Sequence, residues 1–153
     1  MFSIFKYFQK SSISPNNKKF LIVGLGNIGE EYKNTRHNIG FDIVDHLGKI
    51  LKGTFNTAKY GDILKSKYAG KQIILLKPNT FMNLSGKAVL YWLKKEKIHT
   101  NNLIVIVDDL NINFGVSRLK PSGSDGGHNG LKDITNSLNT SNFTRLRFGI
   151  GNN

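Results

Sequence analysis

A short apolar segment runs directly into a glycine-rich turn near the start of the chain, and this junction restricts the fold more than any other feature. Residues 20–23 are typical of a buried strand, and residues 24–29 match the pattern G-x-G-x-x-G. In a dinucleotide-binding fold the third glycine opens a helix whose N-terminus holds a pyrophosphate. Residues 30–38 are instead polar, lack helical apolar spacing and begin with two glutamates that would repel a phosphate. The glycines therefore indicate a loop that gathers three side chains: Asn27, Tyr32 and His37.

Apolar spacing along the rest of the chain alternates between strand and helix periods. It predicts strands at 19–25, 62–68, 71–77, 103–107, 116–120 and 144–150, and helices near 39–51, 85–97 and 131–138. Ala69-Gly70 is typical of a hairpin turn, and residues 121–130 form a loop with four glycines. In a chain of 153 residues this pattern predicts one α/β domain, with a twisted mixed β-sheet flanked by helices.

Composition narrows the class of partner. The chain has 22 Lys and Arg against 10 Asp and Glu, a net charge of +12, which favours an anionic partner. Nucleic acid is the first candidate for this partner, and an anionic membrane surface is the second. Alternatively, the positive charge could reflect a proteome that is rich in lysine throughout, without any anionic partner. The absence of cysteine excludes disulfides and a thiol nucleophile, and no short His/Asp/Glu pattern indicates a metal. The longest apolar run, residues 103–107, is too short to span a membrane.

Two histidines compete for the role of general base. His37 lies in the polar segment after the glycine motif, and a histidine there could accept a proton from water near neutral pH. Alternatively, His37 could be a structural residue that caps the helix that follows it. His128, in the glycine-rich loop, is the rival base. Asp108 ends the central apolar strand, where ligands of open α/β sheets gather, and could hold a histidine in one tautomer. Asp109 should point to the opposite face and is the second choice.

Two asparagines precede predicted helices, and four basic residues follow late in the chain. Asn83 and Asn129 could donate hydrogen bonds to a carbonyl or a developing oxyanion, although helix N-caps are the simpler alternative. The basic residues share strand faces in pairs, which suits a charged surface beside a site, as phosphate recognition requires: Arg118 with Lys120, and Arg145 with Arg147.

Five segments resemble the bacterial-type peptidyl-tRNA hydrolases and occur in that family's order. They are residues 23–27 with Tyr32 and 35–38, then 81–87, 108–110, 127–132, and 145–147 with 149–151. The resemblance covers residues 19–151. It implies a monomeric, cytoplasmic, cofactor-free esterase of phosphorylase/hydrolase-like fold, without metal or membrane attachment. Its implied substrate is peptidyl-tRNA, or an N-blocked aminoacyl-tRNA, whose ester it cleaves to recycle tRNA released prematurely from ribosomes.

The resemblance also implies roles for individual residues. His37 matches the general base, Asp108 its orienting acid, and Asn27 the residue that helps distinguish blocked peptidyl-tRNA from free aminoacyl-tRNA. Positions that bind the substrate are matched by Tyr32, Phe81, Asn83 and Asn129. Positions near the tRNA phosphates are matched by Arg118, Lys120 and Arg147.

The chain departs from the family pattern in two places. Ile28 stands where the family usually has proline, and family members usually continue well past the equivalent of Asn153. Because of this shorter C-terminus, we expect residues 19–153 to be a catalytic domain whose C-terminal part is missing. Residues 1–18, which precede the first predicted strand, are expected to be a flexible basic extension.

Two other functions stay open at this point. A Rossmann dinucleotide binder requires a helix directly after Gly29 and an acid about 20 residues further on. A tRNA-binding remnant without catalysis is the third class, motivated by the short C-terminus.

Overall fold

One seven-stranded sheet organises the part of the chain that the computed structural model describes, residues 18–33, 35 and 38–151. Its strand order is β2-β3-β4-β1-β5-β7-β6. The strands are β1 (Lys19–Gly24), β2 (Asn56–Ala58), β3 (Gly61–Tyr68), β4 (Lys71–Pro78), β5 (Leu103–Asp109), β6 (Ser117–Lys120) and β7 (Thr144–Gly149). The central strands β1 and β5 are almost wholly buried, which explains their continuous apolar sequences.

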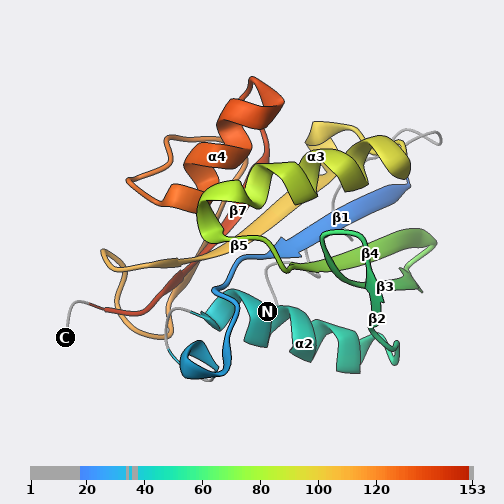
Figure 1. Ribbon diagram of the computed structural model, residues 1–153, viewed down its shortest axis with the longest axis horizontal. Coiled ribbons are helices and arrows are strands. Elements are labelled where there is room, and N and C mark those ends of the chain that lie inside the picture. The colour runs from blue at the N-terminus through green and yellow to red at the C-terminus, as the bar shows by residue number, and fades with distance from the viewer. Residues whose placement is uncertain (1–17, 34, 36–37, 152–153) are drawn as a thin grey trace.

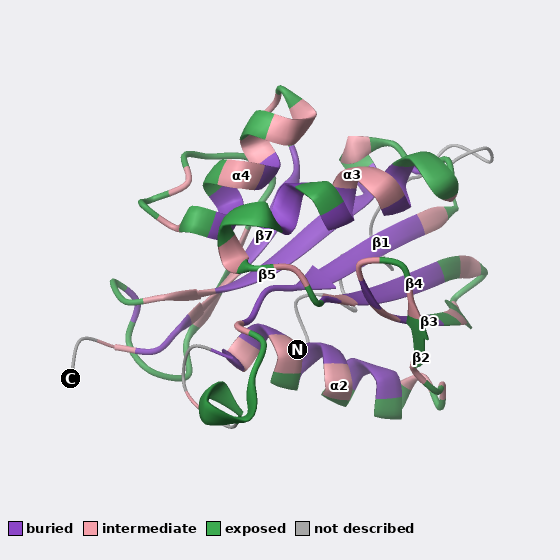
Figure 2. Ribbon diagram, in the orientation of Figure 1, coloured by how far each residue is buried: buried purple, intermediate pink, exposed green. Residues whose placement is uncertain are grey.

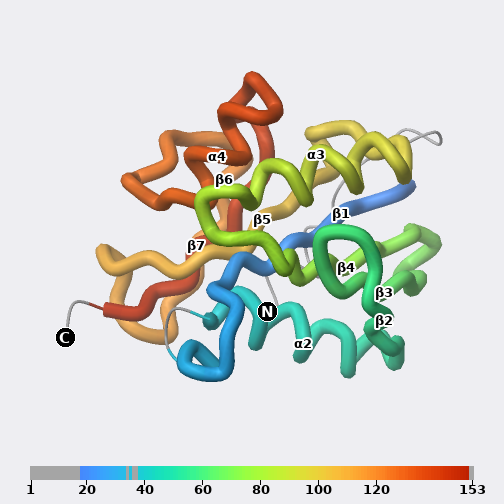
Figure 3. The backbone as a smooth tube through the Cα atoms, in the orientation of Figure 1, coloured from blue at the N-terminus to red at the C-terminus, as the bar shows by residue number. Residues whose placement is uncertain are grey.

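The sheet is mixed, as predicted. Strands β4, β1, β5 and β7 run parallel to one another. The pairs β2–β3, β3–β4 and β6–β7 are antiparallel. The predicted hairpin turn at Ala69 and Gly70 joins β3 to β4, and both residues have positive φ angles, 51° and 77°. This geometry matches the right-handed twist of the strands on either side. Figure 3 shows β6 and β7 lying together beside β5.

Helices cover both faces of the sheet (Figure 1). Helix α2 (Ile39–Ile50) lies on one face, while α3 (Ser85–Lys95) and α4 (Asn129–Leu138) lie side by side on the other. Two apolar clusters result, one with the inward residues of α3 and α4 and one with those of α2. Figure 2 shows these buried faces meeting the buried central strands. No helix among the described residues is long and apolar enough to cross a membrane.

The predicted strands and α-helices are confirmed, with shifts at their ends, and one strand was not predicted. Strand β2 was not predicted because its three residues are exposed or half-buried and carry no apolar alternation. Helix α4 begins at Asn129, two residues before the predicted start, since His128 caps it there. Among the described residues, three short 3₁₀ helices were also missed: η1 (Glu30–Tyr32), η3 (Met82–Leu84) and η4 (Thr100–Asn102). Turns this short have no apolar period to detect.

Two glycines let α2 approach the end of β1 closely. A Cβ atom at Gly24 would overlap the carbonyl of Gly40, and one at Gly40 would overlap the carbonyl of Leu25. Only glycine avoids both overlaps, so the start of α2 lies directly against the carboxyl end of β1.

The connections on either side of β1 place the site. The chain reaches β4 from β1 past α2 on one face, and reaches β5 from β4 through α3 on the other. Such a switch between neighbouring parallel strands opens a crevice at their carboxyl ends, where ligands of open α/β sheets bind.

Candidate active site

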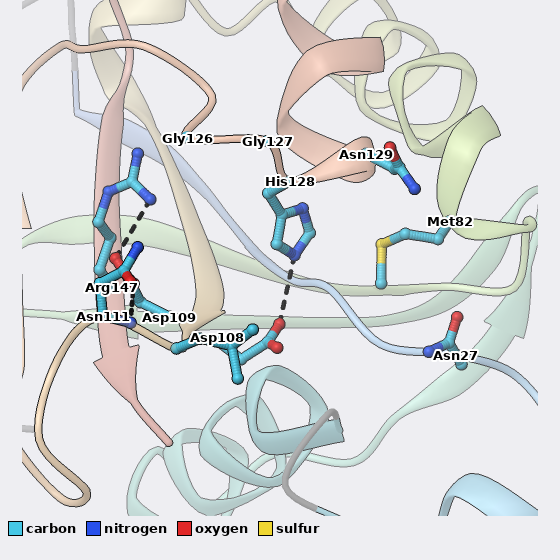
Figure 4. Close-up of a pocket in the computed structure, with 11 residues that line it drawn as sticks. Asn27, Met82, Asp108, Asp109, Asn111, Gly126, Gly127, His128, Asn129 and Arg147 are labelled. Carbon is cyan, nitrogen blue, oxygen red and sulfur yellow. Dashed lines mark hydrogen bonds and ion pairs between the residues drawn. The ribbon is translucent and has the colours of Figure 1, made fainter. Parts of the chain in front are cut away.

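A cavity of about 400 Å³ opens at the carboxyl ends of β1 and β5 (Figure 4). Polar side chains and the glycine-rich loop form most of its wall. Its lining consists of Asn27, Met82, Asp108, Asp109, Leu110, Asn111, Gly126, Gly127, His128, Asn129 and Arg147. The cavity thus brings together six residues that the sequence singled out: Asn27, Asp108, Asp109, His128, Asn129 and Arg147.

Asn27 is held through its backbone, which leaves its side chain to line the cavity. The Asn38 side chain accepts a hydrogen bond from Asn27 N at 2.8 Å and donates one from Nδ2 to Asn27 O at 3.0 Å. Asn38 is 5% exposed and immediately precedes α2. Sequence reasoning placed Asn38 in a family motif but gave it no role, because nothing in the sequence marks it as the partner of Asn27.

Asp108 and His128 face one another across the cavity (Figure 4), and Asp108 Oδ1 lies 3.3 Å from His128 Nε2. The other ring nitrogen, Nδ1, accepts from the backbone N–H groups of Gly130 and Leu131 at 3.1 and 3.3 Å. His128 is therefore the N-cap of α4. A histidine at a helix N-terminus after a glycine-rich loop is the sequence signal for this cap.

Arg147 joins this cavity to a basic hollow beside it. Its guanidinium lies 3.4 Å from Asp109 Oδ2 and donates to Ser124 O at 2.8 Å. The neighbouring hollow, about 480 Å³, is also lined by Arg118 and Lys120 from β6. Since Arg118 pairs with Arg147 in the antiparallel β6–β7 register, the strands bring these cations to one place.

The expectation that Arg145 belongs to this charged surface is wrong. Its side chain is fully buried and stacks on the Phe143 ring, with the guanidinium carbon 4.3 Å from the ring centroid. It donates to the carbonyls of Gly123, Ser124, Ser141 and Phe143 at 2.6–3.4 Å. Burial, followed by the charge of Arg147, lowers the pKa of Arg145. The alternation along β7 correctly separated polar from apolar residues, but the 123–124 segment covers Arg145.

Several predicted site residues lie outside the cavity wall. Tyr32, Phe81 and Asn83 are exposed and are absent from the lining, where the η3 segment contributes Met82 instead. The N-cap alternatives for the two asparagines are also wrong. Asn83 lies inside η3, and Asn129 is the first residue of α4 after its cap. His37 lies outside the described residues, as do positions 1–17.

Neither a metal nor a dinucleotide is indicated by the described residues. They contain no group of three His, Cys, Asp or Glu residues placed to hold a metal ion. The segment after Gly29 is the 3₁₀ helix η1, and the next helix, α2, begins only at Ile39. The helix that a dinucleotide site requires directly after the third glycine is therefore not formed, which argues against the Rossmann alternative.

Sequence comparisons with known proteins all identify the same family. The family model described as "Peptidyl-tRNA hydrolase" matches residues 21–153. The chain is 59% identical over 133 residues to a peptidyl-tRNA hydrolase of Parabacteroides distasonis, covering 87% of this chain and 71% of that protein. It is 58% identical over 134 residues to one of Bacteroides fragilis, covering 88% and 72%.

Solved structures agree with the sequence comparison. A crystal structure of peptidyl-tRNA hydrolase from Acinetobacter baumannii superposes with a TM-score of 0.84 at 41% identity, over 94% of this chain and 72% of that one. The sheet order, the cavity at the carboxyl ends of β1 and β5, and these similarities lead to one conclusion. The chain belongs to the peptidyl-tRNA hydrolase family.

Proposed function

We propose that this chain hydrolyses the ester bond between the peptide and the terminal ribose of tRNA in peptidyl-tRNA, and so recycles tRNA released prematurely from ribosomes. Membership of the family supports the reaction, because hydrolysis of peptidyl-tRNA is the family function. The main structural support for the proposal is that Arg147 lines two adjoining hollows. A polar cavity suited to an ester adjoins a basic hollow suited to phosphates.

The proposed chemistry is a single hydrolytic step assisted by a general base. His37 removes a proton from water, and the water oxygen attacks the ester carbonyl. The carbon–oxygen bond to the ribose then breaks, and the leaving ribose oxygen takes up the proton. Asp108 orients His37 and stabilises its protonated form. General-base assistance is typically worth about 10²–10⁴ in rate.

Of the two amides considered as oxyanion donors, Asn129 is the better placed. Both asparagines are exposed, but Asn129 lines the cavity beside His128, whereas Asn83 does not line it. Loss of one such donor typically costs about 10²–10³ in kcat. Asn27 also lines the cavity and is proposed to discriminate blocked from free aminoacyl groups. Tyr32 and Phe81 are proposed to contact substrate that extends beyond the cavity.

The first experiment measures release of free tRNA from an N-blocked aminoacyl-tRNA, with unblocked aminoacyl-tRNA as the control substrate. The chain should cleave only the blocked substrate, and His37→Ala should lose at least about 100-fold in kcat. His46→Ala is the matched control, because His46 is exposed on α2. Wild-type kcat in a folded His37→Ala protein would refute the role of His37. If the folded wild-type chain binds tRNA without cleaving even a small N-acyl-aminoacyl-nucleotide, a non-catalytic tRNA-binding function replaces hydrolysis.

The basic hollow is proposed to contact tRNA phosphates through Arg118, Lys120 and Arg147. Each phosphate contact should contribute about 0.7–0.9 to the slope of log affinity against log salt. The double variant Arg118→Gln/Lys120→Gln should therefore weaken binding and reduce the slope by about 1.4–1.8. Lys49→Gln, on the exposed side of α2, should change neither quantity. An unchanged slope in the double variant would remove these two residues from the interface.

Domain boundaries and assembly complete the proposal. Residues 19–153 are proposed to form the catalytic domain, so that a chain lacking residues 1–18 should keep wild-type kcat. The enzyme is proposed to act in the cytoplasm, where its substrate arises on ribosomes, and as a monomer. Sedimentation of the full chain at assay concentration tests the last point, and a dimer would contradict it.

A further inference from the structure

Both ring nitrogens of His128 are engaged, and one of them has a fixed role. Nδ1 lies 3.1 Å from Gly130 N and 3.3 Å from Leu131 N. Backbone N–H groups can only donate, so Nδ1 has to present a lone pair to them. A proton on Nδ1 would remove the cap from α4.

The tautomer of His128 follows from this cap. A neutral imidazole carries one N–H, which must lie on Nε2 because Nδ1 is an acceptor. Nε2 faces Asp108 Oδ1 at 3.3 Å, and the two side chains are only 15% and 14% exposed. The ring therefore donates to the carboxylate, and Nε2 has no lone pair with which to take a proton from water.

This geometry excludes His128 as the rival base and gives it another role. We infer that His128 is a positioning residue for the proposed hydrolysis, with its Nε2–H holding the Asp108 carboxylate and its Nδ1 fixing the start of α4. The inference rests on the proposed function, because it assumes that the orientation of Asp108 matters for catalysis.

One side chain thereby links two parts of the cavity. Asp108 is the penultimate residue of β5, and Asn129, the proposed oxyanion donor, is the first residue of α4. The preceding loop contains Gly126 and Gly127, whose φ angles of 59° and 83° lie in the region that favours glycine. Because this loop is exposed, the bond between His128 and Asp108 provides a direct tie from the start of α4 to the sheet.

Two substitutions separate the cap from the contact with Asp108. In His128→Asn the side-chain oxygen lies near the position of Nδ1, so the cap is kept, but no atom reaches Asp108. In His128→Gln the amide N–H₂ lies near the position of Nε2, so a donor to Asp108 is kept while the cap is weakened. The matched control is His99→Asn, because His99 caps η4 through Nδ1 bonded to Asn101 N at 3.1 Å and does not line the cavity.

Steady-state kinetics on an N-blocked aminoacyl-tRNA should give different kcat values for the two His128 variants. His128→Asn should lose about 10–100-fold in kcat with KM within about twofold, a cost similar to that of removing the partner that orients a metal-binding histidine. Its urea unfolding midpoint should stay at the wild-type value. His128→Gln should keep kcat within about threefold of wild type while its urea midpoint falls. His99→Asn should retain wild-type kcat.

Two kinetic outcomes would overturn the inference. Wild-type kcat in His128→Asn would reduce His128 to a helix cap. Equally large losses of kcat in the Asn and Gln variants, together with loss of the wild-type dependence of kcat on pH, would make His128 the proton acceptor.

A measurement independent of catalysis keeps this test separate from that of the proposed function. The ¹⁵N NMR resonances of the His128 ring in the wild-type chain should report the tautomer protonated at Nε2. A tautomer protonated at Nδ1 would overturn the inference, whatever the activity. Absence of hydrolysis by the folded wild-type chain would instead refute the proposed function, while the NMR result would still decide the bond between His128 and Asp108.

Discussion

Replacing Asn38 by aspartate exchanges one NH₂ group for an oxygen, and the surroundings make that exchange costly. The Nδ2 group donates to Asn27 O at 3.0 Å from a side chain that is 5% exposed. In Asn38→Asp an ionised carboxylate would face this carbonyl without a donor between them. Leaving the buried carbonyl unsatisfied costs about 1–3 kcal/mol, and burying the charge adds more.

The variant can escape part of this cost by protonation, which makes the effect dependent on pH. A protonated carboxyl can donate to Asn27 O, so the folded state of Asn38→Asp should raise the pKa of residue 38. Stability is then lost as pH rises above the ordinary aspartate pKa of about 3.9 and returns as pH falls. If the carboxyl stays protonated while folded, the loss reaches about 4 kcal/mol at pH 7, because each pH unit costs about 1.4 kcal/mol.

Urea unfolding followed by the fluorescence of Trp92, the single tryptophan, measures this prediction. The difference in unfolding free energy between Asn38→Asp and wild type should be about 3–4 kcal/mol at pH 7 and should shrink by at least about 1.5 kcal/mol at pH 5. Asn38→Ala is the control, since it loses both hydrogen bonds without adding a titrating group, and its deficit should not change over this range. A deficit in Asn38→Asp that is below about 0.5 kcal/mol at pH 7, or that stays constant with pH, would refute the reasoning.

Substitutions at two further residues test the burial of charge elsewhere. Arg145→Met should lower the unfolding free energy by about 3 kcal/mol or more, because it removes the donor from four backbone carbonyls around a fully buried side chain, and Arg145→Lys should not restore it, because one ammonium cannot replace a planar fork; a methionine variant as stable as wild type in urea would contradict this. Burial acts to raise the pKa of Glu96, but hydrogen bonds from Lys65 and Lys19 outweigh it and lower that pKa. The contribution of Glu96 to stability is therefore present above the ordinary glutamate pKa and lost as pH falls through the lowered value. The deficit of Glu96→Gln should be largest at neutral pH and should shrink as the pH falls below the ordinary glutamate pKa, whereas a deficit independent of pH would show that the ion pairs do not stabilise the fold.

The fold was largely predictable because burial leaves a periodic record in the sequence. Residues 103–107 form a continuous apolar run, and the structure buries them on both faces as the core of β5. The turn at Ala69 and Gly70 was predictable because few residues adopt positive φ angles readily. Strand β2 could not be predicted, since an exposed edge strand of three residues depends on its partner β3 rather than on its own sequence.

The site was predictable in part, for a different reason. Asp108 could be placed because the end of a buried parallel strand is a defined location, and Asp108 lines the cavity there. Arg145 was assigned to the surface because alternation along a strand gives the face of a residue but not what covers that face. The role of Asn38 could not be predicted, since its bonds to Asn27 require the close approach of α2 to β1.

The sequence by itself determined the α-helices, the strands other than β2, the mixed α/β class and the family resemblance, because apolar period, turn residues and motif order are local properties of the chain. The tertiary structure alone decided which polar side chains share a cavity and what each ring nitrogen of His128 contacts. Those contacts join β5, the glycine-rich loop and α4, which are distant in sequence, and a hydrogen bond depends on atomic positions that only the packing of the sheet and helices fixes.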